Sequence, residues 1–214
     1  LMKTWQKIKE NPKLLDQYLV REKVIDTIFC FFKKKGFHEV FTPLLVPAPS
    51  CEPNLEVFET KLTTMTGKKR QGFLIMSPEY SIKKLLVANL GSCFEITRCF
   101  RNNEEVSVQH NPEFTMLEWY RINADYQDVM VDFENLFLEI IGRDKMVYQG
   151  VTYDLTLPWP RITVAEAFGT KNIPEKDFYT TFFNEVEPKL RASRRPTILY
   201  DYPLYQASLA KRKK

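Results

Sequence analysis

Two stretches of alternating residues, joined by a polar loop, constrain the fold of this chain of 214 residues more than any other feature. Residues 93–101 and 113–120 each alternate with a period of two, which is the period of a β-strand. The segment between them is rich in charged and amide side chains. The pattern therefore predicts two strands of a β-hairpin.

One face of this predicted hairpin has an unusual composition. Phe114, Glu118 and Tyr120 share a face of the second strand, and Arg101 shares a face of the first strand with Glu95. A core face would not carry a carboxylate without a partner. If the two faces coincide, they present a guanidinium for a phosphate, a ring for a purine, and an acid with a phenol for an ammonium group. A solvated loop with a plain Arg101–Glu118 ion pair would explain the same residues, and composition alone favours that simpler explanation.

Helical spacing and terminal signals predict helices on both sides of the hairpin. Three predicted helices end at a glycine: 14–35 at Gly36, 77–89 at Gly91 and 126–141 at Gly142. Two more are predicted, a short helix that the capping box from Thr163 to Glu166 opens and a helix over 177–190. Further extended segments are predicted at 37–47, at 56–64 and 71–76 around the turn signal MTGKKR, and at 196–203. Hairpins linked locally, with helices between them, favour a single α+β domain with an antiparallel sheet over residues 1–214.

Composition bounds the class of protein. The chain is long enough to bury one core without disulfides, and 44% of its residues are hydrophobic. It has neither the apolar length of a membrane span nor the apolar run of a secretory signal. Its four cysteines form no CxxC pair, so we expect free thiols, with Cys93 and Cys99 as packing residues, and a cytoplasmic location. Two separate histidines and no CxxC predict no metal site.

The net charge of +4 has a local source. The last four residues, 211–214, are all basic, which leaves 27 positive against 27 negative side chains in the rest of the chain. A basic surface for nucleic acid is therefore not visible in the totals, although a local patch stays compatible with them.

The segment FRNNEEVSVQHNPEFTMLEWY (100–120) resembles motif 2 of the class II aminoacyl-tRNA synthetases, in the form used by lysyl-tRNA synthetases. KKKGFHEVFTPLL (33–45) is similar to motif 1, and SPEYSIKKLLVANLG (77–91) to the segment before motif 2. The resemblance covers most of the chain. It is closest to the elongation factor P lysine ligase subgroup, through SPEY, EWYR and LYDYPLYQASLA. It implies an antiparallel sheet flanked by helices, with motif 1 around 33–45 and motif 2 around 98–121.

The resemblance implies an ATP site. Arg101 matches the catalytic arginine of motif 2, which holds the α-phosphate and stabilises charge as a carboxylate attacks it. Phe114 matches the ring that stacks on adenine, and Glu104 matches the glutamate that accepts from the adenine amino group. The run RNNEE is one residue longer than the family pattern, so Glu105 is the alternative to Glu104. The other matched nucleotide contacts are Asn102, His110 and Asn111.

The resemblance also implies an amino-acid site. Ser77, Glu79, Glu118 and Tyr120 match positions that face the substrate, where a carboxylate would hold an ammonium group. Each has a simpler explanation: Ser77 caps a helix, Glu79 suits the first turn of a helix, and Tyr120 fits a core.

The expected function is ATP-dependent activation of lysine or β-lysine to an aminoacyl-adenylate, with Mg²⁺ on the phosphates, and transfer to a lysine of elongation factor P. The lack of room for an anticodon-binding domain fits this expectation. One alternative is a lysyl-tRNA synthetase core that charges tRNA-Lys, and another is a non-catalytic paralogue or fragment that acts as a binding module.

Motif 3 is absent from these residues, so an incomplete C-terminal part is expected and the activity of the chain stays open. The resemblance to motif 1 implies a homodimer.

Overall fold

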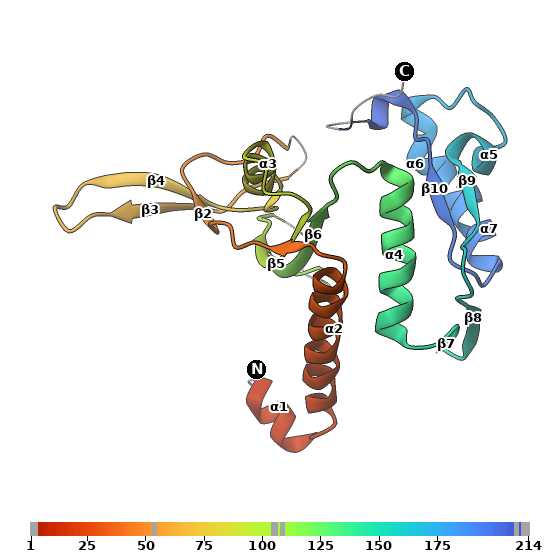
Figure 1. Ribbon diagram of the computed structural model, residues 1–214, viewed down its shortest axis with the longest axis horizontal. Coiled ribbons are helices and arrows are strands. Elements are labelled where there is room, and N and C mark those ends of the chain that lie inside the picture. Colours follow the sequence, from red (N-terminus) through yellow and green to blue (C-terminus); the bar gives the residue numbers. More distant parts are fainter. Residues whose placement is uncertain (1–3, 53–54, 104–106, 108–109, 208–209, 211–214) are drawn as a thin grey trace. The chain divides into compact units, whose positions relative to one another are not determined.

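The computed structural model describes the chain except residues 1–3, 53–54, 104–106, 108–109, 208–209 and 211–214 (Figure 1). The chain divides into two compact units, Leu1–Ala124 and Asp125–Lys214. None of the helices in the described ranges combines the length and hydropathy that crossing a membrane requires.

The first unit contains two small sheets and the helices around them. Its elements are α1 (Thr4–Glu10), α2 (Leu14–Lys34), β1 (His38–Glu39), β2 (Leu45–Val46), β3 (Glu59–Thr63), β4 (Lys69–Leu74), α3 (Glu79–Val87), β5 (Cys93–Phe100) and β6 (Glu113–Tyr120). One sheet has the order β1-β5-β6 and the other β2-β4-β3. The predicted hairpins β3–β4 and β5–β6 are confirmed as antiparallel pairs, whereas β1 runs parallel to β5.

Helix α2 covers one side of the β5–β6 pair. It starts at Leu14 as predicted and ends in the left-handed Gly36, after which the Phe37 N–H donates to the Phe32 carbonyl at 3.0 Å. The Phe32 side chain is fully buried and stacks on Phe94 of β5 with ring centroids 5.0 Å apart. This aromatic core holds one face of the hairpin against the helix and leaves the opposite face for the candidate site.

Helix α3 follows the loop after β4 and ends earlier than the sequence predicts. Its last residue is Val87, and Asn89 already adopts a left-handed conformation, with a φ of 62°, two residues before Gly91, whose φ of 97° is also positive. The Leu90 N–H then donates to the Leu85 carbonyl at 3.2 Å, which closes the helix end. Asparagine tolerates this conformation because its short polar side chain bonds locally, so it replaces glycine as the stop.

The second unit begins with a long helix and continues through short elements. They are α4 (Tyr126–Ile141), β7 (Lys145–Tyr148), β8 (Val151–Asp154), β9 (Arg161–Thr163), α5 (Val164–Phe168), η1 (Glu175–Asp177), α6 (Phe178–Thr181), η2 (Phe182–Val186), α7 (Glu187–Ala192), β10 (Ile198–Tyr200) and η3 (Leu204–Gln206). Strands β7 and β8 pair antiparallel, and β9 and β10 pair parallel.

Helix α4 has the bounds that the sequence predicts. Asp125 and Asp128 form a reciprocal capping box, and Gly142 ends the helix in the left-handed conformation. The buried Glu134 accepts a hydrogen bond from the Trp159 backbone N–H at 2.9 Å and pairs with Arg161 at 3.1 Å. The buried carboxylate on α4 thus receives a hydrogen bond and an ion pair from the chain at the start of β9.

The predicted helical segment 177–190 is confirmed as helical from residue 178 on, but it is not one regular α-helix. It consists of α6, a π-helical turn (η2) and α7. Pro188 stands at the first turn of α7, where its missing N–H and its ring prevent a continuous α-helix through that position. By contrast, the predicted capping box from Thr163 to Glu166 opens α5 as expected.

Candidate active site

The register of the hairpin brings the two unusual faces together. Glu95 lies directly opposite Glu118, and Cys99 lies directly opposite Phe114. Residues directly opposite each other in an antiparallel pair point to the same side of the sheet. The predicted common face of β5 and β6 is therefore confirmed.

One end of this face carries a guanidinium beside an aromatic ring. Arg101 follows the last residue of β5, and its backbone N–H donates to the Pro112 carbonyl at 2.9 Å, which extends the pairing by one step. The guanidinium carbon of Arg101 lies 5.0 Å from the ring centroid of Phe114, a cation–π distance. Both side chains are partly buried. The pair offers a positive charge and a flat apolar surface side by side.

The loop after Arg101 is attached to a residue that lies far away in the sequence, just before β3. Asn102 donates its backbone N–H to the Glu56 carbonyl at 2.9 Å, and the Asn103 side-chain amide donates to the Glu56 carboxylate at 3.2 Å. Asn103 is left-handed, with a φ of 55°. Sequence reasoning missed Glu56 because no local pattern links positions 47 residues apart.

On the returning arm of the loop, Ser107 and His110 bond to each other. The His110 backbone N–H donates to Ser107 Oγ at 3.1 Å, and the Ser107 backbone N–H donates to the His110 carbonyl at 3.0 Å. The His110 ring nitrogen Nδ1 also lies 3.2 Å from Ser107 Oγ. His110 and Asn111 are both exposed and come just before β6. Glu104 and Glu105 fall outside the described residues.

The other end of the face carries a carboxylate with two neutral donors. Ser77 Oγ donates to one oxygen of Glu118 at 2.8 Å, and the Tyr120 hydroxyl donates to the other at 2.5 Å. Burial, followed by the hydrogen bond and the charge of Glu118, raises the pKa of the Tyr120 phenol above its usual range. The phenol therefore stays a donor, and the Glu118 carboxylate is held in one orientation. Such a carboxylate suits an ammonium group.

Glu79 joins this group from the first turn of α3. Its backbone N–H donates to Ser77 Oγ at 3.1 Å, so the serine accepts from the helix while it donates to Glu118. The Glu79 carboxylate pairs with Lys83 one turn further along the helix. Its charge also contributes to the raised pKa of Tyr120. The structure thus brings together all four residues predicted on the amino-acid side.

Buried groups lie beneath the two ends of the site. Glu95 is 2% exposed, and one of its oxygens accepts from the Thr42 backbone N–H at 2.9 Å. Cys93 and Cys99 are fully buried, which confirms them as packing residues. Burial, and then the charge of Glu118, raises the pKa of the Cys99 thiol to about 12. Sequence reasoning placed Glu95 on this face but gave it no role; the period of two was the signal.

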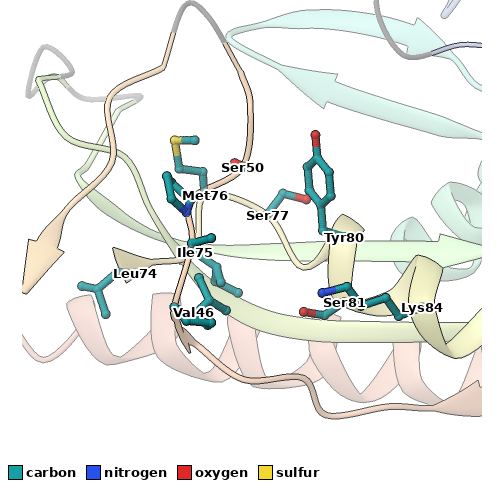
Figure 2. A pocket seen from close by; sticks show the side chains of 12 residues that line it. Val46, Ser50, Leu74, Ile75, Met76, Ser77, Tyr80, Ser81 and Lys84 are labelled. Carbon is teal, nitrogen blue, oxygen red and sulfur yellow. The ribbon is translucent and has the colours of Figure 1, made fainter. Parts of the chain in front are cut away.

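A pocket of about 230 Å³ adjoins the site through Ser77. It lies between the segment 46–50 and the start of α3, as Figure 2 shows. Its lining mixes apolar side chains such as Ile75 and Met76 with the polar groups of Ser77 and Tyr80. A mixed pocket of this kind suits an aliphatic chain that ends in a polar group.

Among the described residues, no group of three or more His, Cys, Asp or Glu side chains is arranged to hold a metal ion.

Comparisons with known proteins agree on the family. A family model described as "tRNA synthetases class II (D, K and N)" matches residues 1–214. A lysine–tRNA ligase from Pelotomaculum thermopropionicum is 35% identical, over 95% of this chain and 45% of the relative. A lysine–tRNA ligase from Carboxydothermus hydrogenoformans is 34% identical, over 95% of this chain and 47% of the relative. The chain spans about half the length of these relatives. Because the family model matches all 214 residues of the chain, the chain belongs to the class II tRNA synthetases of the D, K and N group.

Proposed function

We propose that this chain carries part of the catalytic site of a lysine-activating ligase, which joins lysine to AMP at the expense of ATP. One observation carries the proposal: a single sheet face holds the Arg101–Phe114 pair at one end and the Ser77–Glu118–Tyr120 group at the other. The names of the relatives, lysine–tRNA ligases, support lysine as the amino acid.

The proposed chemistry needs no side-chain nucleophile. A carboxylate oxygen of lysine attacks the α-phosphorus of ATP, the bond from that phosphorus to the bridging oxygen breaks, and pyrophosphate leaves with the electron pair. The Arg101 guanidinium stabilises the negative charge that builds on the α-phosphate, and Phe114 offers its ring to the adenine. Glu118, oriented by Ser77 and Tyr120, holds an ammonium group of lysine and so fixes the attacking carboxylate.

Mg²⁺ would neutralise phosphate charge when it is bound with ATP. Because Mg²⁺ prefers oxygen ligands, the phosphates of ATP are among its expected ligands.

The acceptor of the activated lysine is proposed to be tRNA. The relatives are named lysine–tRNA ligases, which favours tRNA-Lys over elongation factor P. Transfer to elongation factor P, expected from SPEY and EWYR, is the second candidate, with lysine or β-lysine as the donor. A homodimer and a cytoplasmic location stay predictions.

Pyrophosphate exchange tests the activation step. With ATP and lysine, the chain is expected to return labelled pyrophosphate to ATP, and Arg101→Ala to lower that rate by about a hundredfold or more. Arg98→Ala is the matched control, because Arg98 lies on the opposite strand face and is half-exposed in a surface pair with Glu113. It should stay within about twofold of the wild type.

Acceptors then separate the alternatives. Supplying tRNA-Lys or elongation factor P to a chain that performs the exchange shows which one receives the lysyl group. β-Lysine in place of lysine tests the isomer. No exchange with either amino acid would refute activation by this chain and favour a binding module.

A further inference from the structure

A basic ribbon extends from the first unit, away from the residues assigned to ATP and lysine. Strands β3 and β4 pair from Glu59–Phe73 to Thr63–Lys69, and residues 64–68 form the turn between them. Every residue from 59 to 71 is exposed, and Met65 at the tip is fully exposed. Figure 1 shows this ribbon projecting from β2 and the remainder of its unit. The proposed chemistry does not involve any residue of this ribbon.

The ribbon concentrates positive charge in a chain that is otherwise slightly acidic. Residues 59–71 contain Lys61, Lys68, Lys69 and Arg70 against the single acid Glu59, which accepts from the Gln71 side chain. Outside the ribbon and the basic residues 211–214, the sequence has 23 Lys and Arg against 26 Asp and Glu. Within the part of the chain that the structure describes, no ion pair involves these four cations. Their charge is therefore available to a partner.

The cations lie on both faces of the ribbon. Lys61 pairs with Gln71 and Thr63 pairs with Lys69, so Lys61 and Lys69 share one face. Arg70 pairs with Leu62 on the opposite face. A flat anionic surface would meet one face only, whereas a folded RNA presents phosphates in several directions and can contact cations on two faces. The distribution of charge therefore favours a polynucleotide over a membrane surface.

The base of the ribbon is joined to the active-site hairpin. Leu74 at the end of β4 donates its N–H to the Phe58 carbonyl at 3.0 Å, and Phe100 of β5 donates to the Ile75 carbonyl at 2.9 Å. Just before β3, the Glu56 carbonyl accepts from the backbone N–H of Asn102 in the loop after Arg101. These backbone bonds connect the segments at the base of the ribbon, just before β3 and just after β4, to residues next to the phosphate end of the site.

We propose that the β3–β4 ribbon binds the phosphate backbone of an RNA beside the active site, with Lys61, Lys68, Lys69 and Arg70 as the contacts. The identity of that RNA as the acceptor tRNA rests on the proposed function. The contact itself is to phosphates and is independent of base sequence. The ribbon positions the RNA and takes no part in the chemistry.

The test compares two triple variants of the whole chain. Lys68→Ala, Lys69→Ala and Arg70→Ala together remove three exposed cations of the ribbon. Lys171→Ala, Lys176→Ala and Lys189→Ala together remove three exposed cations of the second unit. Fluorescence anisotropy measures binding of a labelled tRNA-Lys transcript and of an unrelated short RNA duplex over a series of salt concentrations. Vesicles containing phosphatidylserine serve as the lipid probe.

The ribbon variant is expected to bind both RNAs about tenfold or more weakly at 0.1 M salt. Its plot of log affinity against log salt should lose about two to three units of slope, since each phosphate contact contributes about 0.7 to 0.9. The control variant should stay within about twofold of the wild type. Unchanged RNA binding by the ribbon variant, equal losses in the two variants, or no RNA binding by the wild type would overturn the proposal. Loss of vesicle binding with intact RNA binding would overturn it in favour of lipid.

Pyrophosphate exchange in the ribbon variant keeps the two proposals apart. The ribbon proposal predicts exchange at the wild-type rate together with weakened RNA binding. If the wild type binds RNA through the ribbon but performs no exchange, the lysine-activation proposal fails and the ribbon proposal stands.

Discussion

At the scale of single residues, the site depends on how one carboxylate is held. Glu118 receives a hydroxyl donor at each oxygen, from Ser77 and from Tyr120. Two neutral donors fix the direction of the carboxylate but leave its negative charge uncompensated. A charge that is oriented and only partly exposed discriminates strongly between a cation and a neutral group.

Replacing Glu118 by Gln removes the charge and nearly preserves the shape. We expect lysine to bind about tenfold or more weakly, with ATP affinity changed by less than about twofold, because only the ammonium loses its partner. Isothermal titration with each ligand measures both. Glu113→Gln is the control: it is the same change on the same strand, at a half-exposed carboxylate paired with Arg98 at 3.3 Å. Equal losses of lysine affinity in the two variants would refute the assignment of Glu118.

The buried Cys99 thiol predicts a loss of stability at alkaline pH. Its pKa is raised from about 9.0 in the unfolded chain to about 12 in the folded chain. Above pH 9 the unfolded state therefore releases a proton that the native state keeps, and stability falls as the pH rises toward 12. Between pH 8 and 10.5 we expect Cys99 to account for about 2 kcal/mol of the decrease in unfolding free energy.

Urea titrations at a series of pH values measure this contribution. Cys99→Ala should lower stability by a constant amount below pH 9 and show a shallower alkaline decline than the wild type. Parallel declines in the two proteins would show that Cys99 does not titrate as its surroundings imply.

At the scale of secondary structure, the ends of a helix are predicted well where the residues that mark them lie next to those ends. Helix α4 shows this, because its capping box at Asp125 and its stop at Gly142 lie next to its ends. We expect Asp125→Ala to lower the unfolding free energy by about 1 kcal/mol, since two backbone donors lose their acceptor. Asp125→Asn should lose less, because it keeps a capping oxygen. Chemical denaturation distinguishes the three proteins, and equal stability of wild type and alanine variant would contradict the capping role.

Patterns within one segment are predictable from the sequence, whereas pairing between distant segments is not. The bounds of β5, β6 and α4 follow from alternation and helical spacing inside each segment. The parallel pairs β1–β5 and β9–β10 join segments that are far apart in the chain, and no local pattern encodes them. The β7–β8 hairpin was missed although Gln149 and Gly150, both with positive φ, provide its turn.

The candidate site shows the same division between local and distant contacts. Alternation places Phe114, Glu118 and Tyr120 on one strand face, and the register confirms that shared face. The bond from Ser77 to Glu118 crosses 41 residues, and the attachment of Asn103 to Glu56 crosses 47. Only the folded chain reveals such contacts. The resemblance of residues 77–91 to the segment before motif 2 supplied Ser77 as a candidate, and the resemblance as a whole gave no indication of Glu56.

At the scale of the whole molecule, the single domain over residues 1–214 stays a prediction that unfolding can test. Trp119 packs against Phe32 in the first unit, and Trp159 packs against Phe137 in the second, so each unit has its own fluorescent reporter. A single cooperative domain predicts the same denaturant midpoint for both reporters in variants that retain one tryptophan each. Two separate midpoints would show that the units unfold independently.

The central claim for the molecule is that one face of the β5–β6 hairpin binds both the nucleotide and lysine. A stable analogue of lysyl-adenylate carries both groups in one molecule and requires no turnover. Its binding to the chain, measured by isothermal titration, tests the claim most directly. We expect saturable binding that Arg101→Ala and Glu118→Gln each weaken by about tenfold or more, and that Arg98→Ala and Glu113→Gln change by less than about twofold. Binding that resists the first two changes, or no binding at all, would contradict it.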